Sequence, residues 1–258
     1  MTAHAESIIG RQREVRKVLS HIRNRKSLHI YGAEGAGKTA LLDWVYDNWG
    51  DTGVPLVPIY CRSSRTFRSI LLYISLHFLD HFKHLESVDK FKRVNEIRYG
   101  TDLKKLSIRA LKKMIFTYIS QDNFCILLDH LDHVTPKINS FLTILYERAL
   151  VISASRQSWE VDDYTFWGNL AYCLYLTPKL RVEQLSRRDT LLQMKHITGD
   201  AFETSTDLLD EIYRITRGNP RLTANIIAKA LMPKYRVDGC INLKLIMLDL
   251  AIEDVPWE

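Results

Sequence analysis

One short stretch restricts the fold of this chain more than any other: a glycine-rich turn set between an apolar strand and an amphipathic helix. Residues 32–39 read GAEGAGKT, which matches the phosphate-binding template G-x-x-x-x-G-K-[ST]. The apolar residues Leu28 and Ile30 precede the turn, and a helical pattern follows it. The alternative is a surface glycine turn that carries a lysine by chance. The order of strand, loop and helix is the context that supports the template match, so the stretch predicts a nucleotide site.

The residue types of this loop fit the chemistry of phosphate binding. Glycines adopt backbone angles that residues with a Cβ resist, so successive N–H groups can turn toward phosphate oxygens. The following helix adds its unsatisfied N-terminal donors and the positive end of its dipole. Lys38 is expected to reach the β and γ phosphates, and the Thr39 hydroxyl to ligate Mg²⁺. The expected cofactors are therefore ATP and Mg²⁺, and the binding loop comprises Gly32, Ala33, Glu34, Gly35, Ala36, Gly37, Lys38, Thr39 and Ala40.

Composition limits the class of protein. With 258 residues, of which 46% are hydrophobic, the chain can bury the core of one large domain or of a domain with a small satellite. The N-terminus MTAHAES does not resemble a signal peptide and no apolar run reaches about 18 residues, so we expect a soluble, cytoplasmic protein with no membrane partner. The four cysteines form no C-x-x-C pair, which argues against a disulfide framework or a zinc site. A formal charge of +6 favours an acidic partner, and nucleic acid is one candidate.

Strand-like and helix-like segments alternate through the first part of the chain. Apolar runs typical of strands buried on both faces of a parallel sheet occur at residues 124–128, 149–153 and 172–176, with a further candidate at 54–60. Helical patterns lie near residues 66–85, 103–119 and 137–148. The charged residues 86–100 are predicted as a surface excursion. This alternation predicts an α/β fold with a parallel sheet. Together with the phosphate loop, it leads us to expect the three-layer sandwich of a P-loop NTPase.

The C-terminal part of the chain has a different pattern. From Arg181 onward the strand signal weakens, and helical segments follow at residues 181–197, 206–217 and 220–231. We therefore expect two domains: a P-loop ATPase domain at residues 1–178, and a helical lid with a C-terminal tail at residues 179–258.

Candidate site residues outside the loop follow the predicted strands, because ligands of open parallel sheets bind beyond the carboxyl ends of the strands. Asp129 ends the run at 124–128 and is the expected Mg²⁺ ligand, although an Asp that merely ends a strand in a turn is the alternative. Many ATPases of this kind place Glu directly after that Asp, whereas this chain has His130. We therefore predict binding more firmly than hydrolysis, and assign the general base to Asp132.

Two arginines complete the candidate site. Arg156 follows the run at 149–153, where a guanidinium can sense or neutralise the γ-phosphate. Arg221 lies in the first turn of a helix that Pro220 begins, so it opposes its own helix dipole, and an anionic partner would offset that cost. For each arginine the alternative is an ordinary solvated surface residue.

These segments together resemble the AAA+ ATPases. They read IGRQRE at residues 9–14, the phosphate loop, LLDHLD at 127–132, SASR at 153–156 and GNPR at 218–221. They look most like the branch shared by signal-transducing STAND ATPases, including NACHT-type members, and by origin-recognition-like or transposition-associated ATPases. The resemblance implies that Ile8, Ile9 and Gly10 border the adenine, that Arg156 is a first sensor and that Arg221 is a second sensor in the lid. Pro220, which precedes Arg221 in the GNPR segment, is also expected among the nucleotide-binding residues.

Weaker patterns have more than one interpretation. His77, His81 and His84 share a helical face, where they are either metal ligands or, more commonly, the polar edge of that helix. The basic stripe, defined as Lys105, Arg109, Lys112 and Lys113, is a solvated helix face, a DNA contact or a contact to an acidic subunit surface. The acidic tail at residues 249–258 either docks on a basic neighbour or is mobile.

The function predicted from these patterns is that of an ATP-binding, ATP-hydrolysing AAA+/STAND-like protein. Its nucleotide state is expected to control self-assembly or engagement of a partner or DNA, in DNA-related or defence work. The resemblance implies a minimal ATPase that is a homo-oligomer or has its effector on another chain. The alternative is a nucleotide-stabilised scaffold or adaptor that does not hydrolyse ATP, with His130 marking the lost turnover.

Overall fold

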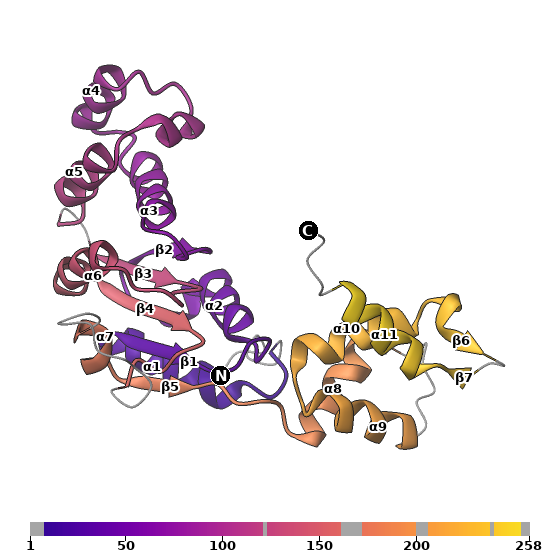
Figure 1. Ribbon diagram of the computed structural model, residues 1–258. Coiled ribbons are helices and arrows are strands. Elements are labelled where there is room, and N and C mark those ends of the chain that lie inside the picture. Colours follow the sequence, from indigo (N-terminus) through magenta and orange to yellow (C-terminus); the bar gives the residue numbers. More distant parts are fainter. Residues whose placement is uncertain (1–7, 121–122, 161–171, 200–205, 238–239, 254–258) are drawn as a thin grey trace. The chain divides into compact units, whose positions relative to one another are not determined.

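The computed structural model describes residues 8–120, 123–160, 172–199, 206–237 and 240–253 (Figure 1). The chain divides into two compact units. The sheet unit contains residues 13–32 and 38–182, and the C-terminal unit contains residues 183–258 together with the N-terminal residues up to 12 and the loop residues 33–37. The predicted domain boundary at residue 178 lies shortly before the division, which follows Val182.

Five parallel strands form the sheet of the first unit. They are β1 (Leu28–Tyr31), β2 (Val57–Cys61), β3 (Phe124–Leu128), β4 (Leu150–Ser155) and β5 (Lys179–Arg181), in the spatial order β2-β3-β4-β1-β5. In the register, Ile30 of β1 lies opposite Ala154 of β4 and Leu180 of β5. Every residue of β3 and β4 is buried, so the centre of the sheet is covered on both faces. The predicted α/β class with a parallel sheet is confirmed.

Helices connect these strands. In the sheet unit they are α1 (Gln12–Arg23), α2 (Lys38–Asp47), α3 (Phe67–His81), α4 (Glu86–Val94), α5 (Ile108–Tyr118), α6 (Pro136–Arg148) and α7 (Tyr172–Leu176), with 3-10 turns η2 (Trp49–Thr52) and η3 (Gly100–Lys105). The largest core lies between β2, β3, β4 and one layer of helices, where Ile74 of α3, Ile115 of α5 and Phe141 of α6 are fully buried. Hydroxyl caps begin α3 at Thr66 and α6 at Thr135.

One prediction for the sheet unit was wrong. Residues 172–176, predicted as a strand, form the short helix α7, and the fifth strand is β5 instead. Leu174 is buried but Tyr175 and Leu176 are 43% and 60% exposed, a one-sided burial that a five-residue apolar run does not reveal in the sequence. The predicted surface excursion at residues 86–100 is mostly exposed, and it contains the helix α4, which the sequence analysis did not predict and in which only Val88 is buried.

The C-terminal unit is helical, as predicted. It contains α8 (Arg187–Thr198), α9 (Thr206–Thr216), α10 (Pro220–Ala230) and α11 (Leu243–Glu253), with the 3-10 turn η6 (Pro233–Tyr235) and a small hairpin of β6 (Arg236–Val237) and β7 (Cys240–Ile241). Its core includes Met194, Ile226 and Ile246. The sequence patterns did not predict the hairpin or α11. Of the predicted acidic tail, residues 254–258 lie outside the described residues. Among the helices described, none is both long enough and apolar enough to cross a membrane.

Candidate functional site

The phosphate-loop sequence begins where β1 ends. Gly32 has a φ of 156°, and a Cβ built there would lie 2.3 Å from the carbonyl oxygen of Val182. Val182 cannot retreat, because its N–H donates to the Tyr31 carbonyl at 2.7 Å as the chain leaves β5. Position 32 therefore requires glycine for a packing reason as well as for phosphate access. At the other end of the loop, the Lys38 ammonium donates to the Gly32 carbonyl at 2.7 Å.

A hydroxyl and a carboxylate meet beside the first turn of α2. Thr39 Oγ1 donates to Asp129 Oδ2 at 2.7 Å, and Asp129 is only 1% exposed. Asp129 Oδ1 accepts the His130 N–H at 2.8 Å, which fixes the carboxylate plane. Mg²⁺ takes octahedral oxygen ligands from one or two protein groups, with waters and phosphate oxygens completing the shell. The pair Thr39 and Asp129 fits that donor set.

The backbone bends sharply after Asp129. His130 has a φ of 57°, the left-handed region that a residue with a Cβ seldom adopts, at a cost of order 1 kcal/mol. The bend allows Leu131 to donate its N–H to the Ala154 carbonyl at 2.9 Å and to bury its side chain. It also leaves His130 Nε2 3.6 Å from Asp129 Oδ2. The segment after β3 is thereby anchored to the end of β4.

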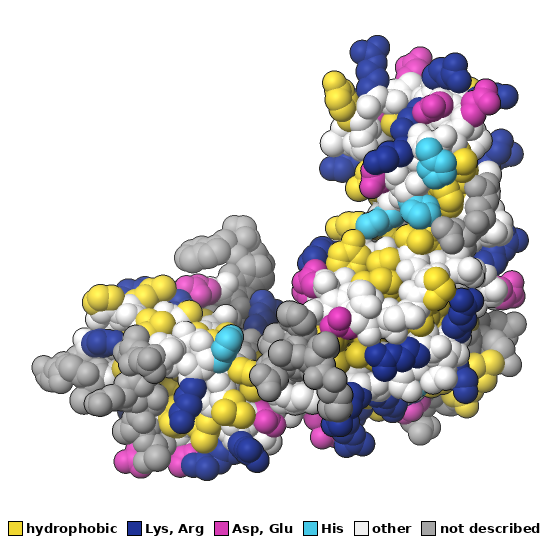
Figure 2. Space-filling view, turned by 180° about the vertical axis from the view of Figure 1, so that it is seen from behind, with side chains coloured by type: hydrophobic (Ala, Val, Ile, Leu, Met, Phe, Trp, Pro, Cys, Tyr) yellow, Lys and Arg dark blue, Asp and Glu magenta, His cyan; other side chains and the backbone are white. Residues whose placement is uncertain are grey.

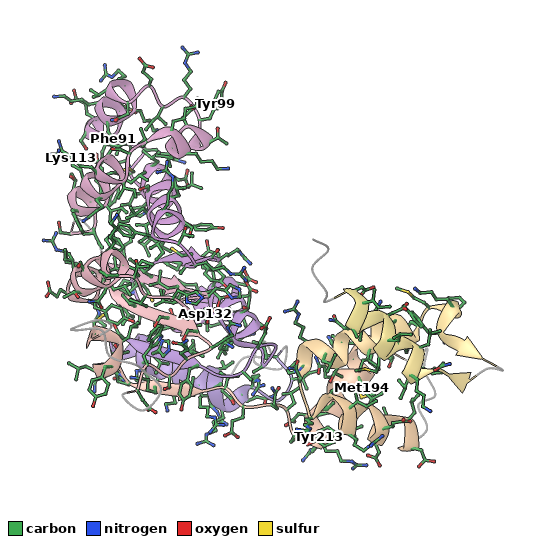
Figure 3. The ribbon with its side chains drawn as sticks, viewed as in Figure 1. Phe91, Tyr99, Lys113, Asp132, Met194 and Tyr213 are labelled. Carbon is green, nitrogen blue, oxygen red and sulfur yellow. The ribbon has the colours of Figure 1, made fainter. Side chains whose placement is uncertain are left out.

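Asp132 lies at the end of the sheet toward which the strands point (Figure 3). Its Oδ1 accepts the Arg156 N–H at 2.7 Å, and its Oδ2 lies 3.6 Å from Arg156 Nε. The structure thus brings together the predicted general base and the predicted first sensor. Because the carboxylate already accepts from Arg156, its clearest role in this arrangement is to hold the arginine.

A buried histidine that the sequence patterns did not single out links β1 to β4. His29 Nδ1 lies 2.8 Å from Ser153 Oγ, and its Nε2 lies 2.9 Å from the Gln157 carbonyl. Tyr146 extends the network, with its hydroxyl 3.1 Å from Ser153 Oγ. Burial lowers the pKa of His29 to about 4, so the ring is neutral at physiological pH. A histidine inside an otherwise apolar strand was the available signal.

Arg11 is a second residue whose role the sequence analysis missed. In the C-terminal unit its guanidinium donates to the carbonyls of Ala36 and Glu183 at 2.7 and 2.6 Å, and the residue is 4% exposed. The adjacent Gly10 has a φ of 70°, and a Cβ there would lie 2.8 Å from Asp189 Cβ. Arg11 stands in the IGRQRE segment, directly after the predicted adenine neighbours Ile9 and Gly10. The buried guanidinium of Arg11 therefore donates to backbone carbonyls, one of which, that of Ala36, belongs to the phosphate loop.

The start of α10 contacts loop residues of the same unit. Asn219 caps the helix by accepting the Leu222 N–H at 3.1 Å, and its amide donates to the Glu34 carbonyl at 3.0 Å. Gly35 has a φ of 75°, and a Cβ there would lie 2.5 Å from Asn219 Oδ1. The predicted second sensor, Arg221, pairs through Nη1 with Glu34 Oε1 at 3.3 Å. The GNPR segment and the loop therefore lie together, with Pro220 at the first position of α10.

The weaker sequence patterns are placed as follows. Burial lowers the pKa of His77, and the His81 ring packs edge-on against Phe82 with centroids 4.7 Å apart. In the described part of the chain no three His, Cys, Asp or Glu side chains gather into a group that could hold a metal ion. The basic stripe is divided, since Lys105 pairs with Asp102 at 2.8 Å and Lys112 lies over the Phe116 ring at 5.6 Å.

Comparison with known proteins adds information on the fold. No protein-family model matches the chain, and no curated protein matches it. Among solved structures, a Walker-type ATPase of Pyrococcus abyssi matches with a TM-score of 0.60 and 15% identity, over 95% of this chain and 73% of that one. Domain III of the Thermotoga maritima replication initiation protein DnaA matches with a TM-score of 0.56 and 16% identity, over 93% of this chain and 92% of that one. At these identities the likeness concerns the fold, which this chain shares with both.

Proposed function

We propose that this chain binds ATP with Mg²⁺ and hydrolyses it as an AAA+-type ATPase. The observation that carries the proposal is the contact of Thr39 with the buried Asp129 directly after a complete phosphate-loop sequence. A glycine loop alone accommodates many anions, whereas a hydroxyl and a carboxylate beside it provide a Mg²⁺ site matched to a nucleoside triphosphate. The fold shared with the Pyrococcus abyssi Walker-type ATPase supports the same conclusion.

The protein groups have distinct tasks in this proposal. Loop N–H groups and the α2 N-terminus bind the phosphate oxygens, and Lys38 exchanges its Gly32 carbonyl partner for the β and γ phosphates. Thr39 and Asp129 would hold Mg²⁺, which would neutralise phosphate charge. Asp132 keeps Arg156 at the end of β4, where a guanidinium stabilises charge that develops on the transferred group.

The water-activating group is assigned to one of two side chains. Asp132 has the carboxylate expected of a general base, and its contact with Arg156 would loosen when that arginine turns to the γ-phosphate. His130 stands where related ATPases place a glutamate, and its ring lies beside Asp129. We retain Asp132 as the proposed base and treat His130 as its competitor.

The finer proposal concerns what the nucleotide controls. We place the chain with STAND-like or initiator-like ATPases, in which nucleotide state governs self-assembly or engagement of a partner on another chain. The likeness to a domain of a replication initiation protein favours DNA-related work over defence work. A cytoplasmic location is part of the same proposal.

Lys38→Ala tests the site directly. Removing one charge-assisted contact, a loss of about 1.5–3 kcal/mol, should weaken ATP binding by roughly ten- to a hundredfold without touching the core. Isothermal titration with ATP and Mg²⁺ measures the affinity, and release of inorganic phosphate measures turnover. Lys26→Ala, at an exposed lysine before β1, is the matched control. Parental binding and turnover in Lys38→Ala would remove the loop from the site.

The second candidate function is the scaffold that binds ATP without hydrolysing it. It is favoured by the engagement of Asp132 with Arg156 and by His130 at the position of the usual glutamate. A scaffold should gain thermal stability equally from ATP and from a slowly hydrolysed analogue, and should release no phosphate with or without DNA. If the parent releases phosphate in a Mg²⁺-dependent way and Lys38→Ala does not, the chain is an ATPase and not a scaffold.

A further inference from the structure

The positive charge of this protein is concentrated in one segment. Residues 83–113, which we call the basic arm, contain ten Lys and Arg against four Asp and Glu, and the resulting +6 equals the formal charge of the whole chain. The rest of the chain therefore carries equal numbers of basic and acidic residues. The basic arm comprises α4, η3 and the first half of α5, and Figure 1 shows α4 at the end of α3 that lies away from the sheet.

Most cations of the basic arm have no acidic partner. Among the residues that the structure describes, Lys90, Lys92, Arg98, Lys104, Arg109 and Lys113 make no ion pair. Elsewhere on the surface, by contrast, Arg62 pairs with Asp43 and Arg187 with Asp210. Figure 2 shows Lys and Arg side chains around this end of the sheet unit, with a few acidic ones among them. Unpaired positive charges at this density repel one another, and an anionic partner would reduce that repulsion.

An aromatic ring is exposed among these charges. Tyr99 is 74% exposed and lies at the tip of the arm, between α4 and η3 (Figure 3). Its backbone is held in place, because Asp102 Oδ2 accepts the N–H groups of Arg98 and Tyr99 at 3.1 and 3.0 Å. Val94, the last residue of α4, is also 74% exposed and adds apolar surface to the arm. An exposed ring on an anchored backbone, next in sequence to Arg98, provides a stacking platform.

A groove of about 950 Å³ opens between α4 and η3. Its lining contains four basic residues, Lys92, Arg93, Arg98 and Lys105, and three acidic ones. One of the acids, Asp102, already accepts the Lys105 ammonium at 2.8 Å, so the other cations exceed the remaining carboxylates. The groove is polar, which suits a phosphodiester backbone better than an apolar ligand.

We propose that the basic arm binds single-stranded nucleic acid, with its phosphates on the unpaired cations and one base stacked on Tyr99. Single strands are favoured over duplexes because the base faces of a duplex are covered by their neighbours, whereas an unpaired base can stack on an exposed ring. An acidic protein surface would satisfy the cations but makes no specific use of the ring. This inference uses no residue of the ATP site, so it stands independently of the proposed ATPase.

The test compares two triple variants of the full chain with equal charge loss. The arm variant carries Lys90→Gln, Arg98→Gln and Lys104→Gln, and the control carries Lys26→Gln, Lys137→Gln and Lys195→Gln at exposed lysines outside the arm. Fluorescence anisotropy follows binding of labelled oligothymidylate and oligouridylate of about 20 nucleotides, and of a hairpin duplex, across a salt series. If three phosphate contacts are lost, the slope of log affinity against log salt should flatten by about two units in the arm variant only.

Tyr99 variants separate stacking from charge. Tyr99→Ala should weaken binding of the single strand roughly tenfold at constant salt slope, whereas Tyr99→Phe should bind like the parent. No binding by the parent, equal losses in the arm and control variants, or unchanged binding in Tyr99→Ala would overturn the proposal. Preference for the duplex would also overturn it. So would an arm variant whose oligonucleotide affinity is unchanged but whose self-association, measured by sedimentation velocity, is impaired, and that result would favour an acidic protein surface as the partner. ATP turnover measured on the same variants keeps this result separate from the ATPase.

Discussion

Asp129 and Asp132 lie three residues apart, yet their surroundings differ. Asp129 is buried between the Thr39 hydroxyl and the His130 N–H, a setting that suits a metal ligand. Asp132 accepts the Arg156 N–H through Oδ1, and its Oδ2 forms an ion pair with Arg156 Nε at 3.6 Å. The left-handed His130 produces this difference, because the bend turns the second carboxylate away from the first and toward the end of β4.

Substitutions at these positions distinguish the two candidate bases. If Asp132 activates water, Asp132→Asn should lower the rate of ATP hydrolysis about a hundredfold while ATP affinity stays within a few fold, because general bases contribute 10²–10⁴. His130→Ala should then have a smaller effect on the rate. Single-turnover phosphate release and isothermal titration measure the two quantities. A larger loss in His130→Ala would transfer the base to the histidine.

His29 makes stability depend on pH. Its pKa is about 4 in the folded protein, chiefly because of burial, against 6.5 for an exposed histidine. Between these two pKa values the unfolded chain binds a proton at His29 and the folded chain does not. The free energy of unfolding therefore falls as the pH drops from 6.5 toward 4. For these two pKa values, proton linkage lowers the free energy of unfolding by about 2 kcal/mol between pH 7.5 and pH 5.

Urea unfolding of His29→Gln at those two pH values tests this expectation. The variant cannot titrate at this position, so it should lose about 2 kcal/mol less than the parent over the same interval. His84→Gln, at an exposed histidine, is the control and should follow the parent. An equal pH response in the parent and His29→Gln would refute the linkage.

Site residues were predictable from the sequence where their role depends on near neighbours along the chain. Lys38 and Thr39 follow from the loop spacing, and Asp129 from its place after an apolar run. Arg11 and His29 were not predictable, because their partners are Glu183 and Ser153, far away in sequence. The contact of Asp132 with Arg156 depends equally on the pairing of two strands, which no local pattern contains.

At the scale of secondary-structure elements, the length and symmetry of the apolar pattern decided which predictions succeeded. β3 and β4 were predicted because each is a run of apolar residues buried on both faces. α7 was mistaken for a strand because its five residues are too few to show a helical period. α4 was missed because its contact with the core relies on Val88 and the partly buried Phe91, two apolar residues among many charges.

The helix α10 is the element whose response to nucleotide we expect to be largest. Arg221, in its first turn, pairs with Glu34 in a contact where both side chains are 66% exposed. Such surface pairs contribute only about 0–1 kcal/mol, so a γ-phosphate can replace Glu34 readily. Arg221→Ala should therefore reduce the ATP-dependent change in scattering profile or assembly more than it reduces ADP affinity.

Glu34→Gln is the matched control for Arg221→Ala. It removes the negative charge of the present partner of Arg221 but leaves the arginine, so the response to ATP should persist or increase. Small-angle scattering of both variants with ADP and with a slowly hydrolysed ATP analogue provides the comparison. Identical responses of Arg221→Ala and the parent would exclude Arg221 from the switch.

At the scale of the whole molecule, the net positive charge and the proposed ATP site belong to different segments of the chain. The proposed ATP site draws on the loop and the ends of β3 and β4, whereas the net charge belongs to residues 83–113. Variants in one segment should therefore leave the other intact, which makes the two proposed activities separable by substitution. The overall charge of +6 indicated an acidic partner, but only the structure relates it to an exposed ring and a groove.

The spatial order of the strands also sets the order in which the protein can fold during synthesis. β1, which leads into the phosphate loop, has only β4 and β5 as neighbours, and these strands begin at Leu150 and Lys179. The ribosome must therefore deliver more than a hundred further residues before β1 gains its first strand partner. β2 and β3 can pair earlier, with the helices between them. The strand that opens the nucleotide loop is thus made first but gains its strand partners only after β2 and β3 can pair, so a nascent chain can assemble the proposed ATP site only once β4 has been synthesised.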